Sequence, residues 1–184
     1  DGYEGWITEP QTHQVSGETY NEIISTDTII SGDIMNYVSN QDNLIFPILI
    51  GSDLRGLKKL NHTFNGETYF PEPNKKKLSK TAFMYLNSPY LWGGRTPLGI
   101  DCSGFTQIVY KINGLKLSRD AHEQANQGQT LSFIEESEAG DLAFFDDPEG
   151  KIVHVGLLLE DHYIIHAHGT VRIDRIDQSG IYNG

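Results

Sequence analysis

The segment Asp101-Cys102-Ser103-Gly104 holds the only cysteine among the 184 residues, and thiol chemistry is the first chemistry to consider. A lone cysteine is often a small buried hydrophobic residue, so its surroundings decide between that role and a nucleophile. Asp101 is a good helix N-cap, which places Cys102 in the first turn of a helix. Unpaired backbone amides and the helix dipole favour a thiolate there, so the pattern predicts a nucleophilic cysteine.

A cysteine nucleophile needs a base, and histidine suits proton exchange near neutral pH. Residues 152–159 and 163–167 are rich in apolar and β-branched residues and predict a hairpin centred near Glu160. His154 then lies opposite His166 on one face of the sheet, where one ring can orient the other. His168 shares that face and could compete with His166 for the orienting role.

Two other interpretations of these histidines remain open. A histidine in a strand is often a half-buried residue without a catalytic role. His166 and His168 could also be two ligands of a metal ion, but no third ligand has an obvious spacing. The sequence therefore predicts neither a metal nor a cofactor, with His154 as general base.

The elements that must position these residues lie after a polar stretch at residues 71–77, which predicts a boundary between a β-rich region, 1–73, and a second domain, 74–184. Helical spacing predicts a short helix over residues 78–86 and a second helix from near Cys102 to Gly114. A loop is expected over residues 90–100. Strands are expected at 142–145, 152–159, 163–167 and 171–176, so the fold class is α+β.

Composition excludes several classes of function. Twenty-five acidic against fourteen basic residues give a formal charge of −11, which argues against nucleic acid and anionic membranes as partners. No apolar run approaches the roughly 20 residues that span a bilayer, so no membrane insertion is expected. A single cysteine excludes an internal disulfide and a four-cysteine zinc site. A soluble monomer is the expectation.

Several motifs in order resemble the NlpC-type cell-wall peptidases over residues 78–184. They are Tyr90-Leu91-Trp92-Gly93-Gly94, Asp101-Cys102-Ser103-Gly104-Phe105, Gly140-Asp141-Leu142, His154-Val155-Gly156 and Ile165-His166-Ala167. The resemblance implies a compact papain-like fold, with a helix bearing the cysteine packed on an antiparallel sheet bearing the histidines. It also implies Cys102 as nucleophile, His154 as base, His166 as third residue and Tyr90 as a hydroxyl toward the oxyanion.

The branch that the sequence resembles comprises γ-D-glutamyl-L-diamino acid endopeptidases, which cut peptidoglycan stem peptides and require a free N-terminal L-alanine. The implied substrate-binding residues are Asp101, Ser103, Trp92, Arg119 and Asp120. A carboxylate such as Asp101 is a sensible ligand for an ammonium group. The resemblance favours the cell envelope, periplasm or exterior as the location, with a cytoplasmic recycling role as the alternative.

The amino-terminal residues 1–7 look like a late strand of a bacterial SH3-like barrel, incomplete at its beginning. Tyr3 would then wall off the amino end of the peptide, or the barrel would only bind the wall. Two rival functions remain: a papain-fold amidase or acyltransferase using the same cysteine and histidines, and a non-catalytic wall-binding module.

Overall fold

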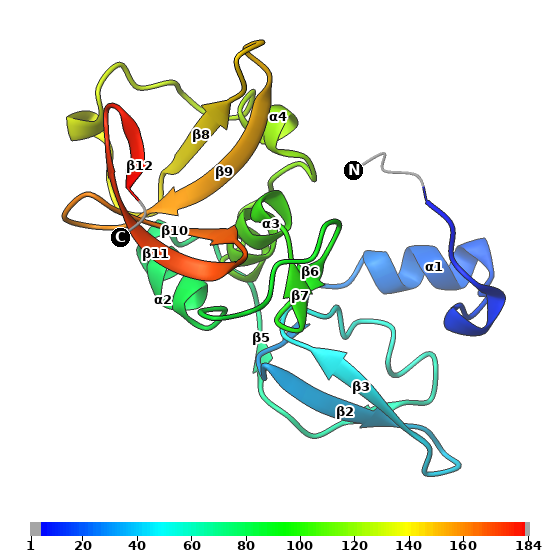
Figure 1. Cartoon of the computed structure of the whole chain (residues 1–184). Coiled ribbons are helices and arrows are strands. Elements are labelled where there is room, and N and C mark those ends of the chain that lie inside the picture. The colour runs from blue at the N-terminus through cyan, green and yellow to red at the C-terminus, as the bar shows by residue number, and fades with distance from the viewer. Residues whose placement is uncertain (1–4, 183–184) are drawn as a thin grey trace. The chain divides into compact units, whose positions relative to one another are not determined.

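The computed structural model describes residues 5–182 and divides into two compact units, Asp1–Pro71 and Glu72–Gly184. The boundary predicted from the sequence followed residue 73. Each unit has its own strands, shown in Figure 1, and the residues proposed for catalysis all belong to the second unit.

In its described residues, the first unit consists of short strands, one α-helix and one 3-10 helix, and its sheets are ordered β3-β2-β4 and β1-β5. Its elements are η1 Glu9–Gln11, α1 Gly17–Ile24, β1 Ile30–Ser31, β2 Met35–Ser39, β3 Ile45–Leu49, β4 Thr63–Phe64 and β5 Thr68–Tyr69. The sequence analysis did not predict α1. Ser16 caps this helix by accepting a hydrogen bond from the Thr19 amide.

A strand was expected over residues 1–7, and the structure describes residues 5–7 of this segment. Gly5, Trp6 and Ile7 have no strand assignment, and Trp6 is fully exposed, so its ring gains nothing from packing. Tyr3 lies outside the described residues. The resemblance of this region to an SH3-like barrel therefore stays a prediction.

The second unit is a five-stranded antiparallel sheet, ordered β12-β11-β10-β9-β8, with helices packed against it (Figure 1). Its helices are η2 Lys75–Lys77, α2 Leu78–Phe83, α3 Cys102–Ile112, α4 Ala121–Gln124 and η3 Ile134–Glu136. Its strands are β6 Arg95–Thr96, β7 Gly99–Ile100, β8 Leu142–Asp146, β9 Ile152–Leu158, β10 Tyr163–His168, β11 Thr170–Asp177 and β12 Gly180–Tyr182. This mixed α/β arrangement confirms the predicted helix packed on an antiparallel sheet.

Most predicted elements of this unit are present. The second helix begins at Cys102, and Gly114 follows its end with φ of 69°, a left-handed conformation that glycine adopts at little cost. The short helix α2 ends at Phe83, and turns continue to Asn87. The predicted loop at 90–100 contains the small hairpin β6-β7, and the short elements α4 and β12 were not predicted.

The two faces of the sheet have different tasks because side chains alternate along each strand. Val155 and Leu157 are fully buried, and Val155 packs with Cys102 of α3. Leu158 occupies the opposite face of β9, where it packs with Ile164. The helix therefore brings the thiol to β9 beside the residue that follows His154.

Candidate active site

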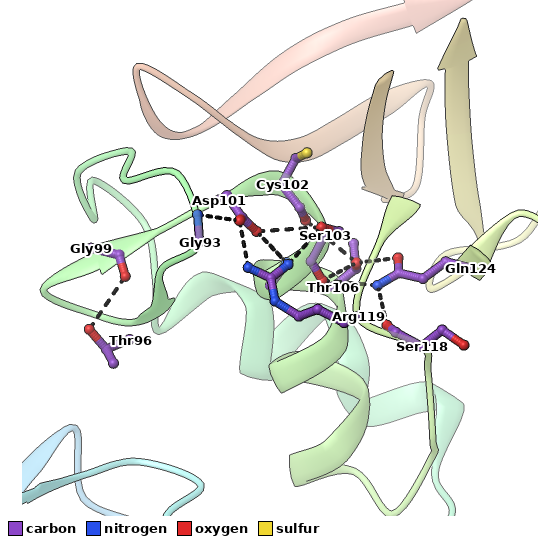
Figure 2. Close-up of polar contacts among 11 residues, drawn as sticks. Gly93, Thr96, Gly99, Asp101, Cys102, Ser103, Thr106, Ser118, Arg119 and Gln124 are labelled. Carbon is purple, nitrogen blue, oxygen red and sulfur yellow. Dashed lines mark hydrogen bonds and ion pairs between the residues drawn. The ribbon is translucent and has the colours of Figure 1, made fainter. Parts of the chain in front are cut away.

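Cys102 is the first residue of α3 and is 8% exposed. The Asp101 carboxylate caps the helix, because its Oδ1 accepts a hydrogen bond of 2.6 Å from the Gly104 amide. The sulfur points away from the polar network below it (Figure 2) and lies beside the backbone amide of Val155. The predicted N-terminal placement of the cysteine is confirmed.

The electrostatics of the thiol differ from the expectation. Burial raises the pKa of Cys102; hydrogen bonding from the Val155 amide lowers it, and the negative charge of Asp101 raises it further. The amides of residues 102 and 103 act in the lowering direction, but the net pKa is raised. Cys102 is therefore a neutral thiol at rest, because its desolvation outweighs the helix terminus.

His154 and His166 are in direct contact, with 2.8 Å between His154 Nε2 and His166 Nδ1. The predicted register was wrong by two residues, since His166 lies opposite Gly156. Asp161 and His162 take positive φ of 57° and 61°, which moves the centre of the turn beyond Glu160. A shift of two residues keeps every side chain on its predicted face, so the two rings still meet, diagonally.

His168 lies on the same face but has a different relation to the pair. Its ring stacks on His166 at 6.2 Å between centroids and stands 6.3 Å from the ring of His154. Within residues 5–182, the ring that shares a hydrogen bond with His154 is that of His166. The geometry thus favours His166 over His168 as the orienting residue.

His154 sits where the pairing of β8 and β9 becomes irregular. Phe145 lies opposite His154 while Asp146 lies opposite Ile152, so Val153 is an extra residue on β9. Such bulges redirect side chains and are frequent next to active sites. Ile152 consequently packs toward Cys102, and Phe145 flanks His154 with 5.8 Å between ring centroids.

The environment keeps His154 neutral. Burial, together with the neighbouring rings of His166 and His168, lowers the pKa of His154 to about 4. The pKa of His166 is also lowered, because burial outweighs the opposing effect of its partner Asp174. At neutral pH both rings of the contacting pair are uncharged imidazoles.

Gly156 provides the space for this contact. A Cβ at position 156 would lie 2.6 Å from Ile164 Cδ1 and 2.9 Å from His166 Cβ, closer than side chains approach. Glycine at this position therefore lets the His166 side chain lie across β9 and reach His154.

Asp174 was missed by the sequence analysis. Its Oδ2 lies 2.9 Å from His166 Nε2, and its Oδ1 accepts a hydrogen bond of 2.7 Å from Arg172 Nη2. Its side chain is 4% exposed. Burial alone would raise the pKa of Asp174, but the hydrogen bonds from His166 and Arg172 outweigh it and lower the pKa. The signal was available in the alternation of 170–177, which places residues 172 and 174 on the face of a paired His166.

A second buried carboxylate, Asp101, lies on the helix side of the site. Arg119 Nη2 donates to Asp101 Oδ2 at 2.6 Å, and Nη1 donates to Asp101 Oδ1 at 3.1 Å and to Ser103 Oγ at 2.9 Å (Figure 2). The Gly93 amide donates to Oδ2 at 2.7 Å. The structure therefore brings together three predicted substrate-binding residues in one buried hydrogen-bonded network.

Three further predicted site residues, Tyr90, Trp92 and Asp120, are described by their surroundings. Burial raises the pKa of Tyr90, and negative charge on Asp101, or on Cys102 as a thiolate, raises it further. Trp92 is 85% exposed. Asp120 is the residue before α4, and its carbonyl accepts hydrogen bonds from the amides of Glu123 and Gln124.

The part of the chain that the structure describes lacks two kinds of feature. None of their helices has the length and apolar character needed to cross a membrane. Between residues 5 and 182, no group of three or more His, Cys, Asp or Glu side chains is arranged to hold a metal ion.

The chain belongs to the NlpC/P60 family, whose sequence profile matches residues 87–183. It is similar to the γ-D-glutamyl-L-lysine dipeptidyl-peptidase of Bacillus cereus, with 29% identity over 91% of this chain and 57% of the relative. The enzyme of the same name from Bacillus subtilis is 42% identical over 50% of this chain and 31% of the relative. The chain thus spans less than two thirds of either curated relative.

A solved structure supports the same assignment. The crystal structure of an NlpC/P60 family protein from Bacillus cereus superposes with a TM-score of 0.73 at 25% identity, covering 95% of this chain and 66% of the other. The chain is therefore a member of a family that includes peptidoglycan hydrolases and peptidases.

Proposed function

We propose that this chain is a thiol peptidase that hydrolyses the bond between the γ-carboxyl of D-glutamate and a diamino acid in peptidoglycan stem peptides. The observation that carries the proposal is the packing of Cys102 on β9 at Val155, next to the irregular pairing at His154, while His154 Nε2 is committed to His166. Nδ1 of His154 is then the ring atom left to exchange a proton with the thiol. The names of the curated relatives support the bond specificity.

The reaction follows from these positions. Cys102 Sγ attacks the carbonyl carbon of the scissile amide as its proton passes to His154 Nδ1. The Tyr90 hydroxyl and the Cys102 amide would donate to the oxyanion. The imidazolium of His154 then protonates the leaving amine, and the C–N bond breaks to leave a thioester. Water, deprotonated by His154, hydrolyses the thioester and regenerates the thiol.

The requirement for a free N-terminal L-alanine is the most demanding part of the proposal. Both oxygens of Asp101 already accept bonds from Arg119 and from backbone amides. A substrate ammonium at Oδ2 would have to share that oxygen with Arg119 Nη2 and the Gly93 amide. This sharing is chemically reasonable for a carboxylate with several lone pairs, and it makes the amine test decisive for Asp101.

The remaining parts of the proposal follow from the substrate. Stem peptides occur in the cell envelope and in fragments returned to the cytoplasm, so either is the expected place of action. The first unit, taken as an SH3-like segment, would limit the site to short peptides or bind the wall.

The central experiment compares hydrolysis of L-Ala-γ-D-Glu-diaminopimelate with hydrolysis of the same peptide acetylated at its amine. We expect cleavage of the free peptide only, and loss of cleavage in Cys102→Ser and His154→Ala. Equal cleavage of both peptides would rule out the amine requirement. Activity that persists in Cys102→Ser would overturn the mechanism.

A pair of histidine variants tests the third residue. His166→Ala should lower kcat strongly, because His154 loses the group that orients it, whereas His168→Ala should have a much smaller effect. Steady-state kinetics on the free peptide decides the matter. Inactivation by His168→Ala alone would show that the assignment of His166 is wrong.

The pH dependence should reflect the lowered pKa of His154. Only neutral imidazole can act as base, so kcat/KM should persist below pH 6.5 and fall as the pH drops through about 4. The same depression means that stability present above pH 6.5 is lost as the pH falls toward 4. Circular dichroism at each pH separates unfolding from protonation. An acid limb near pH 6.5 in folded protein would contradict a desolvated base.

A further inference from the structure

Three polar side chains form a diagonal line across β9, β10 and β11 on the face of the sheet that carries the base. His154 contacts His166 at 2.8 Å, and His166 contacts Asp174 at 2.9 Å. The register explains the diagonal: His166 lies opposite Gly156 on one side and opposite Arg172 on the other, so each partner is displaced by two residues. The line ends at a carboxylate that the proposed mechanism has not yet used.

The number of donors and acceptors on each group determines which ring nitrogens of His166 and His154 carry a proton. An ionised carboxylate can only accept, so His166 Nε2 must carry the proton that lies between them. A neutral imidazole has one donor and one acceptor nitrogen, so His166 Nδ1 accepts, and His154 Nε2 must donate to it. His154 Nδ1 is thereby left without a proton, as a base requires.

We propose that Asp174 is a positioning residue that sets the tautomers of His166 and His154 in sequence, so that the lone pair on His154 Nδ1 is available to the Cys102 thiol. This inference deepens the proposed function and rests on it for the role of the thiol. The tautomers themselves belong to the resting protein and can be measured without substrate.

Arg172 determines which oxygen of Asp174 faces His166. It donates to Asp174 Oδ1, which leaves Oδ2 for His166, and its side chain is 37% exposed while that of Asp174 is 4% exposed. The lowered pKa of Asp174 agrees with an ionised carboxylate, and the lowered pKa values of both histidines agree with neutral rings. His168 stacks on His166 and, among the described contacts, takes no hydrogen bond from this line.

The substitution Asp174→Asn keeps the shape of the side chain but changes the proton order. Arg172 still requires an acceptor, so the amide oxygen should take the place of Oδ1 and the NH2 group should face His166. His166 Nε2 must then accept, its Nδ1 must donate to His154 Nε2, and His154 Nδ1 must carry a proton. The base is lost although no catalytic atom has been removed.

The experiment uses proteins with ¹⁵N-labelled histidine and reads the tautomers by NMR, together with kcat/KM on the free peptide. We expect Nε2–H tautomers at His154 and His166 in the unmodified protein and Nδ1–H tautomers in Asp174→Asn. We expect kcat/KM of this variant to fall by about 10²–10⁴-fold, the range for a lost general base. Asp177→Asn, an exposed change on the same strand, is the matched control and should alter neither.

The double variant Asp174→Asn with Arg172→Ala tests the direction of the amide. Without the guanidinium the amide can turn its oxygen to His166, so the tautomers should return and kcat/KM should recover about tenfold or more relative to Asp174→Asn, reversing much of the loss of the base. If neither the tautomers nor kcat/KM recover in the double variant, the role of Arg172 is overturned. Unchanged tautomers in Asp174→Asn would overturn the inference, even if activity fell.

The two proposals can fail separately. If the peptide is not cleaved by the unmodified protein, the proposed function fails while the NMR measurement still decides the proton order. If the peptide is cleaved but His154 carries its proton on Nδ1 at rest, the proposed function stands and the inference fails.

Discussion

The site has a buried aspartate on each side, and each aspartate is paired with an arginine. On the helix side, Asp101 is held by Arg119 at 2.6 Å and by the amides of Gly93 and Gly104. On the sheet side, Asp174 is held by Arg172 at 2.7 Å, and its other oxygen contacts His166. Besides its arginine, Asp101 contacts backbone amides, whereas Asp174 contacts the titratable ring of His166. The same pair of residue types therefore supports the fold in one place and directs protons in the other.

The largest expected effect on stability belongs to the helix side. Asp101→Ala removes the N-cap of α3 and leaves Arg119, which is 7% exposed, without this carboxylate. Removing one partner of a buried ion pair costs about 3–5 kcal/mol, so the free energy of unfolding should fall by about that amount in urea denaturation.

A double variant separates the two contributions of Asp101. Asp101→Ala combined with Arg119→Ala removes the buried charge together with its partner and should be less destabilised than Asp101→Ala alone. A loss below about 1 kcal/mol in the single variant would show that the pair is better solvated than its burial indicates.

A smaller effect is expected on the sheet side, where space rather than charge is limiting. Gly156→Ala would place a Cβ 2.9 Å from His166 Cβ, and overpacking of this kind costs about 1–3 kcal/mol. The displaced His166 should also lower kcat. Gly17→Ala is a matched control, because a Cβ there meets nothing within 4 Å. Full activity and stability in Gly156→Ala would mean that His166 does not need its present position.

The smallest effect should come from Ser103→Ala. Its hydroxyl accepts one of the bonds from Arg119 Nη1, but that nitrogen also donates to Asp101, so the loss should be about 1 kcal/mol. If Ser103 also binds substrate, KM should rise while the stability changes little. Unfolding in urea and steady-state kinetics on one protein preparation distinguish these roles. An unchanged KM would restrict Ser103 to supporting Arg119.

Local patterns were enough to predict much of the second unit. The helix beginning at Cys102, the cap at Asp101 and four of the five strands of the sheet follow from capping chemistry and periodicity, which act within a few residues. The pairing of His154 with His166 also followed, because an error of two residues in register leaves the face unchanged. The short elements α4 and β12 lack enough residues to show a period.

The sequence by itself determined which residue types could react and that His154 and His166 would share a face of the sheet. It did not determine the pKa of the thiol, because desolvation depends on how α3 packs against Val155. It also did not reveal that Asp101 is shared with Arg119, or that Asp174 completes a line through His166 to His154. These contacts join residues on different elements, and only the tertiary structure brings them within the reach of a hydrogen bond.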